Sequence, residues 1–294
     1  MVTINNSSGP RQQLLNLNCS KVVSYAYLFA REPELFLPYA CLDLPYEIYQ
    51  QADDIRKAFS LWANDYSSQE YLAQLRWRLF LDFDKLPTPI SQAVREEEYF
   101  PNDIFSSFSN EVFVDCGAFD GDTIKRFLQR RKYCFGNIIA LEPDPINYQK
   151  LQTYVSTLPD NIENRVAVLQ VAVGSCKEKV RLQEIGTMAS SVSTTGTLEV
   201  DCVPLDEVLA DCLPTLIKMD LEGFELDAIA GASRVIEQAS AVLAVTVYHC
   251  QDHLWRIPLL IQSLSDQYRF FLRPYAEEYW DVSCYAVPVS RLIV

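Results

Sequence analysis

The sequence contains few glycines and few basic residues. The first shortage shows where tight turns can occur, and the second limits the partners that the protein can bind. Only nine glycines occur in 294 residues, and eight of them lie between Gly117 and Gly231, so tight turns are concentrated there. Lys and Arg number 25 against 39 Asp and Glu, which gives a net charge of −14. No basic cluster larger than residues 130–132 offsets this charge. We therefore expect neither a nucleic acid nor a membrane surface as a partner.

The sequence also lacks paired cysteine motifs and long apolar runs. Its nine cysteines are scattered, without a CxxC pair, and several lie in apolar strand patterns, which favours reduced thiols in a cytoplasmic protein. The longest clearly apolar segment, residues 241–248, is too short to span a bilayer. The N-terminal residues show no charged stretch followed by an apolar core, so we expect no secretion signal.

The spacing of apolar residues changes near residue 110. Before it, three- and four-residue spacing predicts helices over 25–36, 46–63 and 68–83. After it, predicted strands (111–116, 137–142, 165–173, 198–205, 214–220, 241–249) alternate with predicted helices (122–132, 144–158, 224–238, 254–267), and two strands (268–275, 282–288) close the chain.

This alternation predicts a doubly wound α/β fold. Its sheet should be mostly parallel, with a C-terminal antiparallel hairpin and ligands bound at the carboxyl ends of its strands. We divide the chain into a helical region, residues 1–110, and a ligand-binding domain, residues 111–294. The helical region could serve as a substrate lid or in oligomerisation, although plain packing explains most of its aromatic residues.

The first candidate motif is VFVDCGAFDGDT, residues 112–123, a strand followed by a glycine turn and a helix. It is neither GxGxxG nor a phosphate loop, because no GK[ST] follows. Its carboxylates, Asp115, Asp120 and Asp122, suit a cationic ligand without phosphate, such as S-adenosylmethionine. The alternative is a tight turn in which Asp120 or Asp122 only caps the helix.

The second candidate is IIALEPDP, residues 138–145. Glu142 ends the next predicted strand, 25 residues after Gly117, which is close to the spacing at which an acid accepts hydrogen bonds from ribose hydroxyls. The alternative is that Glu142 only precedes a proline turn, while Asp144 caps the following helix.

The third and fourth candidates are IKMDLEGFEL, residues 217–226, and VYH, residues 247–249. Lys218 and Asp220 are two residues apart in a predicted strand, so they share a face. Glu222 and Glu225 are acids typical of a helix start. His249 ends the adjacent predicted strand and is a natural proton acceptor near neutral pH.

Taken together, these four ordered motifs resemble the FkbM-type S-adenosylmethionine-dependent methyltransferases over residues 111–289. Two departures are Phe224, where a small residue is common, and HLW in place of DLW at 253–255. The resemblance implies a class I methyltransferase (Rossmann-like) fold. It also implies methyl transfer to a hydroxyl of a natural product or sugar.

Our hypothesis for the reaction assigns roles to these residues. His249 would remove the proton of the acceptor hydroxyl, Asp220 would orient it or act as the alternative base, and Lys218 would pair with Asp220 or steady the oxyanion. We expect no metal, with a divalent ion on Asp220 and Glu222 as the alternative. The expected contacts of the methyl donor are Asp115, Gly117, Ala118, Phe119, Asp120, Gly121, Asp122, Thr123, Glu142, Pro143, Asp144, Asn147, Val171, Ala172 and Asp220.

Two other classes remain open from the residues alone. A nicotinamide-dependent oxidoreductase would also use a strand–glycine–helix turn and Glu142, although GxGxxG is absent. A non-catalytic cofactor-binding protein, with the N-terminal helices as an interaction module, is the second alternative. The expected partner of the methyltransferase is a small-molecule acceptor, and a homodimer is an open alternative.

Overall fold

The chain forms two compact units in a computed structural model. The structure describes residues 2–3, 8–35, 45–82, 86, 91–183, 186–187, 191–192, 196–277 and 279–293. Unit 1 comprises Met1–Glu98, Val247–Arg256 and Phe271–Ser283, and unit 2 comprises Tyr99–Thr246, Ile257–Phe270 and Cys284–Val294. Residues 36 and 83, at the ends of two predicted helices, lie outside the described residues. The functional division at residue 110 stays a prediction.

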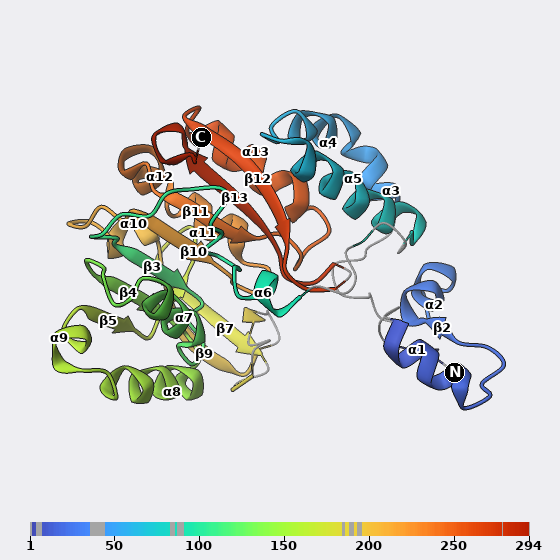
Figure 1. Cartoon of the computed structure of the whole chain (residues 1–294), viewed down its shortest axis with the longest axis horizontal. Coiled ribbons are helices and arrows are strands. Elements are labelled where there is room, and N and C mark those ends of the chain that lie inside the picture. The colour runs from blue at the N-terminus through green and yellow to red at the C-terminus, as the bar shows by residue number, and fades with distance from the viewer. Residues whose placement is uncertain are drawn as a thin grey trace. The chain divides into compact units, whose positions relative to one another are not determined.

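A seven-stranded sheet has the order β12-β13-β11-β10-β3-β4-β5 (Figure 1). The five strands from β11 to β5 pair in parallel with their neighbours, and the connection reverses direction between β3 and β10. This confirms the predicted doubly wound α/β fold with a mostly parallel sheet. The strands are β3 (Phe113–Cys116), β4 (Ile138–Leu141), β5 (Val166–Leu169), β10 (Leu216–Met219), β11 (Val242–Thr246), β12 (Tyr268–Pro274) and β13 (Val282–Pro288).

The central strands are apolar because both faces of such a parallel sheet are covered. Every residue of β3, β10 and β11 is buried. Two charged residues interrupt these runs, Asp115 in β3 and Lys218 in β10, and they are partners in the strand register. A buried charge is costly unless it is paired, so the register itself indicates an ion pair in the core.

Helices connect the parallel strands. The connecting helices are α7 (Asp122–Arg130), α8 (Pro145–Ser156), α9 (Asp160–Glu163), α10 (Leu205–Val208), α11 (Glu225–Ala230), α12 (Ser233–Ala239) and α13 (His253–Leu264). The predicted helix 224–238 is interrupted between α11 and α12. The chain approaches its own backbone there, because a Cβ atom at Gly231 would lie 1.9 Å from the carbonyl oxygen of Gly174. The last helical turn of the chain is η2 (Val289–Arg291).

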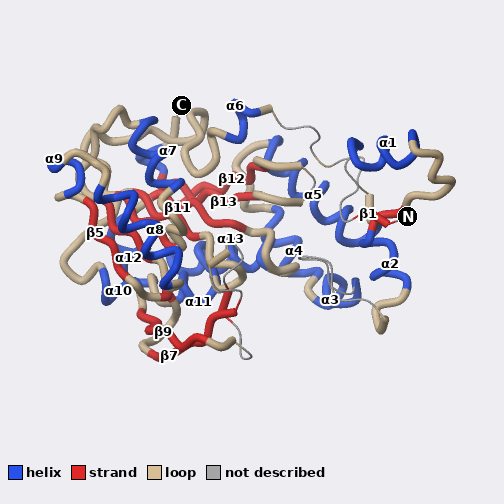
Figure 2. Tube along the Cα trace, turned by 90° about the horizontal axis from the view of Figure 1, so that it is seen from below, coloured by secondary structure: helices blue, strands red, loops and turns tan. Residues whose placement is uncertain are grey.

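A second, four-stranded sheet was not predicted. Its order is β6-β9-β7-β8, with β6 (Ala172–Val173), β7 (Glu178–Gln183), β8 (Ser191–Val192) and β9 (Leu198–Val203). Figure 2 shows β7 and β9 as a group separate from the central sheet. The predicted strand 165–173 is therefore divided: its first part is β5, and its last two residues begin the small sheet.

Unit 1 joins the N-terminal helices to two later segments. Trp77 of α5 stacks on Tyr279 with ring centroids 4.4 Å apart, and Trp255 Nε1 donates to Gln51 Oε1 at 2.7 Å. The predicted helix 46–63 is two helices, because the chain turns at Gln51. The elements before β3 are β1 (Val2–Thr3), α1 (Ser8–Asn16), β2 (Val23–Ser24), α2 (Tyr25–Arg31), α3 (Pro45–Gln50), α4 (Ala52–Phe59), α5 (Asp65–Phe80) and α6 (Gln92–Arg95).

Among the described residues, no helix has the length and apolar character needed to cross a membrane. The eight cysteines in the same part of the chain are free thiols: three are buried, three are half-buried, and Cys134 and Cys176 are exposed.

Candidate functional site

The polar residues singled out in the sequence gather at the carboxyl ends of three neighbouring strands. β4, β3 and β10 run in parallel, so their last residues lie along one edge of the sheet. Gly117 follows β3, Glu142 follows β4 and Asp220 follows β10. Ligands of doubly wound sheets bind at this edge, next to the point where the strand order reverses.

A buried ion pair lies beneath this edge. Lys218 Nζ is 3.1 Å from Asp115 Oδ1, and the two side chains are 3% and 0% exposed. Nζ also donates to the carbonyl oxygen of Gly117 at 2.6 Å. Burial favours the neutral amine, but the carboxylates of Asp115 and Asp220 outweigh it and raise the pKa of Lys218 above its usual value. Lys218 therefore stays charged, and its ammonium group is bound to the end of β3 and to the turn at Gly117.

Asp115 is the buried acid of this pair. Burial raises the pKa of Asp115 to about 6, although the charge of Lys218 opposes this shift. Lys218 pairs with Oδ1, whereas Oδ2 is buried and accepts no hydrogen bond from the residues that the structure describes. An acceptor in that position suits the ammonium group of a ligand.

The turn after β3 needs glycine for a reason that the sequence did not reveal. Gly117 has φ +80°, and a Cβ atom there would lie 2.0 Å from the carbonyl oxygen of Asp220. The missing side chain therefore lets the β3 turn approach the end of β10. Gly121 has φ +91°, and its Cβ would meet the ring of Tyr154 at 2.6 Å. The absence of a side chain at both glycines therefore lets this loop pack closely against β10 and α8.

Glu142 is fixed by two backbone amides. Its Oε2 accepts from Phe119 N at 2.8 Å, and its Oε1 accepts from Asp144 N at 2.9 Å. Burial raises the pKa of Glu142 to about 7, while these two amides and Lys218 lower it. Each carboxylate oxygen has a further lone pair, so the group is oriented to accept from two neighbouring hydroxyls.

Two other residues predicted to contact the methyl donor, Asp144 and Asn147, form hydrogen bonds within the protein. Asp144 Oδ1 accepts from the first amides of α8, Ile146 N and Asn147 N, at 2.8 and 3.0 Å, and its Oδ2 accepts from Gly186 N at 2.6 Å. Asn147 Nδ2 donates to Thr187 O at 3.0 Å. These two side chains thus tie the start of α8 to residues 186–187.

The remaining predicted donor contacts divide into three groups. Asp122 Oδ1 accepts from Thr123 N at 2.7 Å within the first turn of α7. Ala118 is buried, and Phe119, Asp120 and Pro143 are half-buried near the same turns. Val171 lies between β5 and β6, and Ala172 lies in β6 of the small sheet rather than on the third strand of the central sheet as expected.

Asp220 has a partner that sequence reasoning missed. Tyr99 Oη donates to Asp220 Oδ2 at 2.8 Å, and Lys218 Nζ lies 5.4 Å from the centroid of the Tyr99 ring. Tyr99 is buried and has φ +64°, an unusual conformation for a large side chain, and its amide donates to Tyr285 Oη. Tyr99 lies 121 residues before Asp220, and nothing in the local pattern marks it.

Glu225 is more deeply placed than its position at a helix start suggested. It is fully buried, and its Oε1 accepts from Leu221 N at 2.9 Å and from Thr246 Oγ1 at 3.2 Å. Thr246 Oγ1 also lies 3.4 Å from Asp220 Oδ1. Glu225 thus fixes the loop between β10 and α11, while Glu222 is half-buried with φ +51°.

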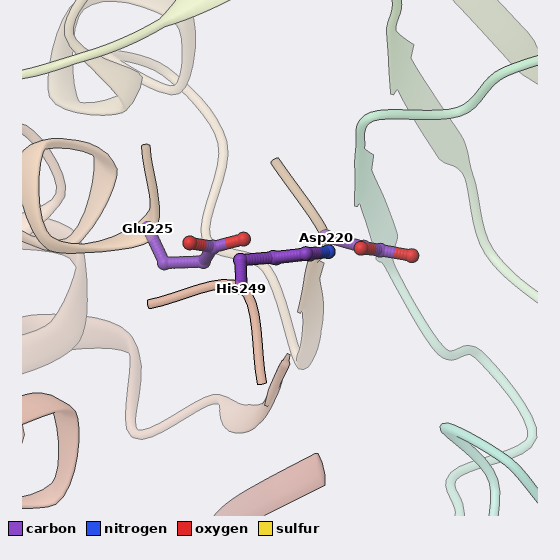
Figure 3. A group of neighbouring side chains, drawn as sticks. All are labelled: Asp220, Glu225 and His249. Atoms are coloured by element: carbon purple, nitrogen blue, oxygen red, sulfur yellow. The ribbon is translucent and has the colours of Figure 1, made fainter. Parts of the chain in front are cut away.

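Asp220, Glu225 and His249 form a group of the kind that can hold a metal ion (Figure 3). One ligand atom of each lies within 4.8 Å of the others. Two carboxylates and an imidazole suit a divalent cation such as Mn²⁺, Fe²⁺ or Zn²⁺. Asp220 and His249 thus lie close to one another, and the acid near them in this group is Glu225. The catalytic roles of Asp220 and His249, and the alternative metal site on Asp220 and Glu222, stay predictions.

Comparison with known proteins identifies the family of the chain. Residues 115–278 match the family model described as the methyltransferase FkbM domain. A crystal structure of methyltransferase FkbM from Methylobacillus flagellatus KT superposes with a TM-score of 0.81 and 24% identity, covering 97% of this chain and 72% of that one.

More distant structures resemble parts of the chain. A putative rRNA methylase from Clostridium thermocellum has a TM-score of 0.42 and 9% identity, over 67% of this chain and 94% of its own. A precorrin-6y C5,15-methyltransferase from Geobacter metallireducens GS-15 has a TM-score of 0.38 and 12% identity, over 68% and 90%. The comparison with curated proteins gives no match.

Proposed function

Since the chain belongs to the family of methyltransferase FkbM domains and is a methyltransferase with the class I fold, we propose that it transfers the methyl group of S-adenosylmethionine to a hydroxyl oxygen of a small molecule. The observation that carries this proposal is the pair of buried carboxylates at the strand ends, Asp115 and Glu142. The alternative of a nicotinamide-dependent oxidoreductase loses its support, because the matched family transfers methyl groups.

Asp115 and Glu142 fit the two ends of the donor. Asp115 Oδ2, buried beside the Gly117 turn, would accept from the donor ammonium. Glu142, held by two amides, would accept from the ribose hydroxyls. S-adenosylmethionine, when bound, supplies a methyl group on a sulfonium centre. The protein positions that methyl group, and positioning removes the entropy cost of bringing two reactants together.

His249 and Asp220 are our assignment for the acceptor. The acceptor hydroxyl must lose its proton as its oxygen attacks, and His249 would take this proton, with Asp220 as its orienter or as the alternative base. Tyr99 Oη holds Asp220 Oδ2, so one oxygen of the carboxylate is fixed. Lys218 is a positioning residue rather than an oxyanion donor, because it is 3% exposed and already bound to Asp115 and Gly117.

A metal-assisted version of the same reaction is the second candidate. A divalent ion held by Asp220, Glu225 and His249 would acidify the hydroxyl directly, and His249 would then be a ligand instead of a base. Dialysis against a chelator separates the two versions. The base mechanism predicts unchanged turnover, and the metal mechanism predicts a loss that Mn²⁺ or Zn²⁺ restores.

The donor and acceptor roles need separate experiments. Calorimetry with adenosylhomocysteine and with NAD tests the donor: only the first should bind, and binding of NAD alone would overturn the proposal. Comparison of metabolites in cells with and without the gene identifies the acceptor for a methyl-transfer assay. In that assay, His249→Ala and Asp220→Asn should lose turnover while keeping adenosylhomocysteine affinity. The matched control is Asp211→Asn, an exposed carboxylate outside the site.

We also propose a cytoplasmic location and a small-molecule partner. The free thiols of the described cysteines support the location, because such thiols persist where disulfides are reduced. The net charge of −14 supports a partner other than nucleic acid. A homodimer remains a proposal, and light scattering on the purified chain would decide it.

A further inference from the structure

A row of five rings runs through unit 1 and ends at His249. Trp77 stacks on Tyr279 with centroids 4.4 Å apart, and Tyr279 lies 4.7 Å from Trp280. Trp280 meets Tyr248 nearly edge-on at 5.9 Å, and Tyr248 lies 4.2 Å from the imidazole of His249. We call these five residues the aromatic row. All of them belong to the unit that contains the proposed base.

The aromatic row is buried at one end and open near the other. Trp77 and Tyr279 have no exposed surface, whereas Trp280 is 36% exposed and Tyr248 is half-buried. Val247 N donates to Val282 O at 2.9 Å, which joins the backbone segments on which these rings stand. The buried rings therefore hold the exposed indole in place. A ring that is already ordered loses little further freedom when a ligand stacks on it.

The chemistry of the row indicates what it would bind. Apart from His249, its side chains are neutral rings, and the chain as a whole carries a net charge of −14, which disfavours an anion. Indole and phenol rings stack on flat apolar faces. Because the row ends at the proposed base, the ligand should also carry a hydroxyl group at the rim of its ring.

We propose that Trp280 and Tyr248 form the acceptor-binding platform and take a neutral, hydroxylated ring by its apolar face. This inference rests on the proposed function, because it makes His249 the group that meets the rim hydroxyl. Two sources share this chemistry, an aromatic ring with its π face and a pyranose with its face of C–H groups. The platform gives a role to a partly exposed tryptophan whose ring contacts Tyr248, the neighbour of the candidate base.

The test measures binding of two probes, 4-hydroxybenzyl alcohol for the aromatic source and methyl β-D-glucopyranoside for the pyranose. Saturation-transfer NMR on the full chain gives their affinities. Acrylamide quenching of tryptophan fluorescence shows where they bind, because the other three tryptophans, Trp62, Trp77 and Trp255, are buried and leave Trp280 as the accessible one. The variants are Trp280→Ala, Trp280→Phe and the control Phe80→Ala, whose ring is 64% exposed and lies outside the row.

We expect at least one probe to bind and to shield Trp280 from acrylamide. Trp280→Ala should weaken that binding by about tenfold or more, as for other stacked anchors, whereas Trp280→Phe and Phe80→Ala should keep most of it. The platform is refuted if neither probe shields Trp280, or if both bind Trp280→Ala as tightly as the wild type. Adenosylhomocysteine affinity is measured on the same proteins. If adenosylhomocysteine did not bind to the wild type, the proposed function would be contradicted. The binding of the ring probes would still test the platform separately.

Discussion

Replacing Glu142 by glutamine tests the donor site without any knowledge of the acceptor. Glu142 is 5% exposed, and burial raises its pKa from 4.5 to about 7. This shift means that the folded protein disfavours the charged form by roughly 3 kcal/mol. Glutamine cannot ionise, so it avoids this cost. Its side chain has only one acceptor oxygen, however, so one of the two backbone amides that bind Glu142 loses its hydrogen bond at every pH.

The sign of the effect on stability follows from the raised pKa. At pH 4 the side chain of Glu142 is largely protonated in the folded and the unfolded chain, and no charge is buried. As the pH rises from about 4.5 through 7, the folded state is left holding protons that the unfolded state has released, so the wild type loses stability from this group. As the pH rises across this range, the unfolding free energy of Glu142→Gln should therefore increase by roughly 3 kcal/mol relative to that of the wild type.

Urea unfolding of both proteins at pH 4.5, 6 and 8 measures this difference, and the other acidic groups cancel because both chains carry them. Calorimetry at pH 8 should show that the wild type, although less stable, binds adenosylhomocysteine more tightly than the variant. The Gln variant should bind adenosylhomocysteine about 10- to 100-fold more weakly, since hydrogen bonds from ribose to a charged acceptor are lost. A stability difference that does not change with pH would refute the buried carboxylate, and unchanged affinity would refute its contact with ribose.

Four further outcomes follow from the same edge of the sheet. Lys218→Met should lower the unfolding free energy in urea by about 3–5 kcal/mol by leaving Asp115 unpaired, and adding Asp115→Asn should recover part of it. Tyr99→Phe should reduce turnover about tenfold with unchanged adenosylhomocysteine affinity in calorimetry, since it releases one oxygen of Asp220, whereas the exposed Tyr66→Phe should change neither. Gly117→Ala should abolish adenosylhomocysteine binding, because its Cβ would meet a backbone carbonyl at 2.0 Å. Turnover that survives a chelator would exclude the metal version.

The strands that build the site could be predicted because their signal is local. β3, β10 and β11 are short runs of mostly apolar residues, broken only by Asp115 and Lys218, and this pattern identifies buried parallel strands. The small sheet could not be predicted in the same way. β7 reads EKVRLQ, in which only two of six residues are buried, so its sequence resembles an exposed connection.

The site shows the same limit. Asp115, Glu142 and Asp220 follow or end predicted strands, so their meeting follows from parallel order alone. The contact between Tyr99 and Asp220 spans 121 residues and depends on packing that no local pattern encodes. Glu225 was interpreted as a helix-start acid because such acids are common, yet it is fully buried. Its role depends on Thr246, which reaches it from the neighbouring strand.

Unit 1 is built from three separate segments of the chain, and this limits which parts can be exchanged with those of related proteins. The N-terminal helices pack on residues 247–256 and 271–283, through contacts such as Trp255 to Gln51 and Tyr279 to Trp77. A chimera that exchanges only residues 1–98 would therefore carry half of an interface whose other half still belongs to the original chain. Three segments would have to be transplanted together. Variation in acceptor choice should accordingly arise by coordinated substitution across these segments rather than by exchange of a modular N-terminal domain.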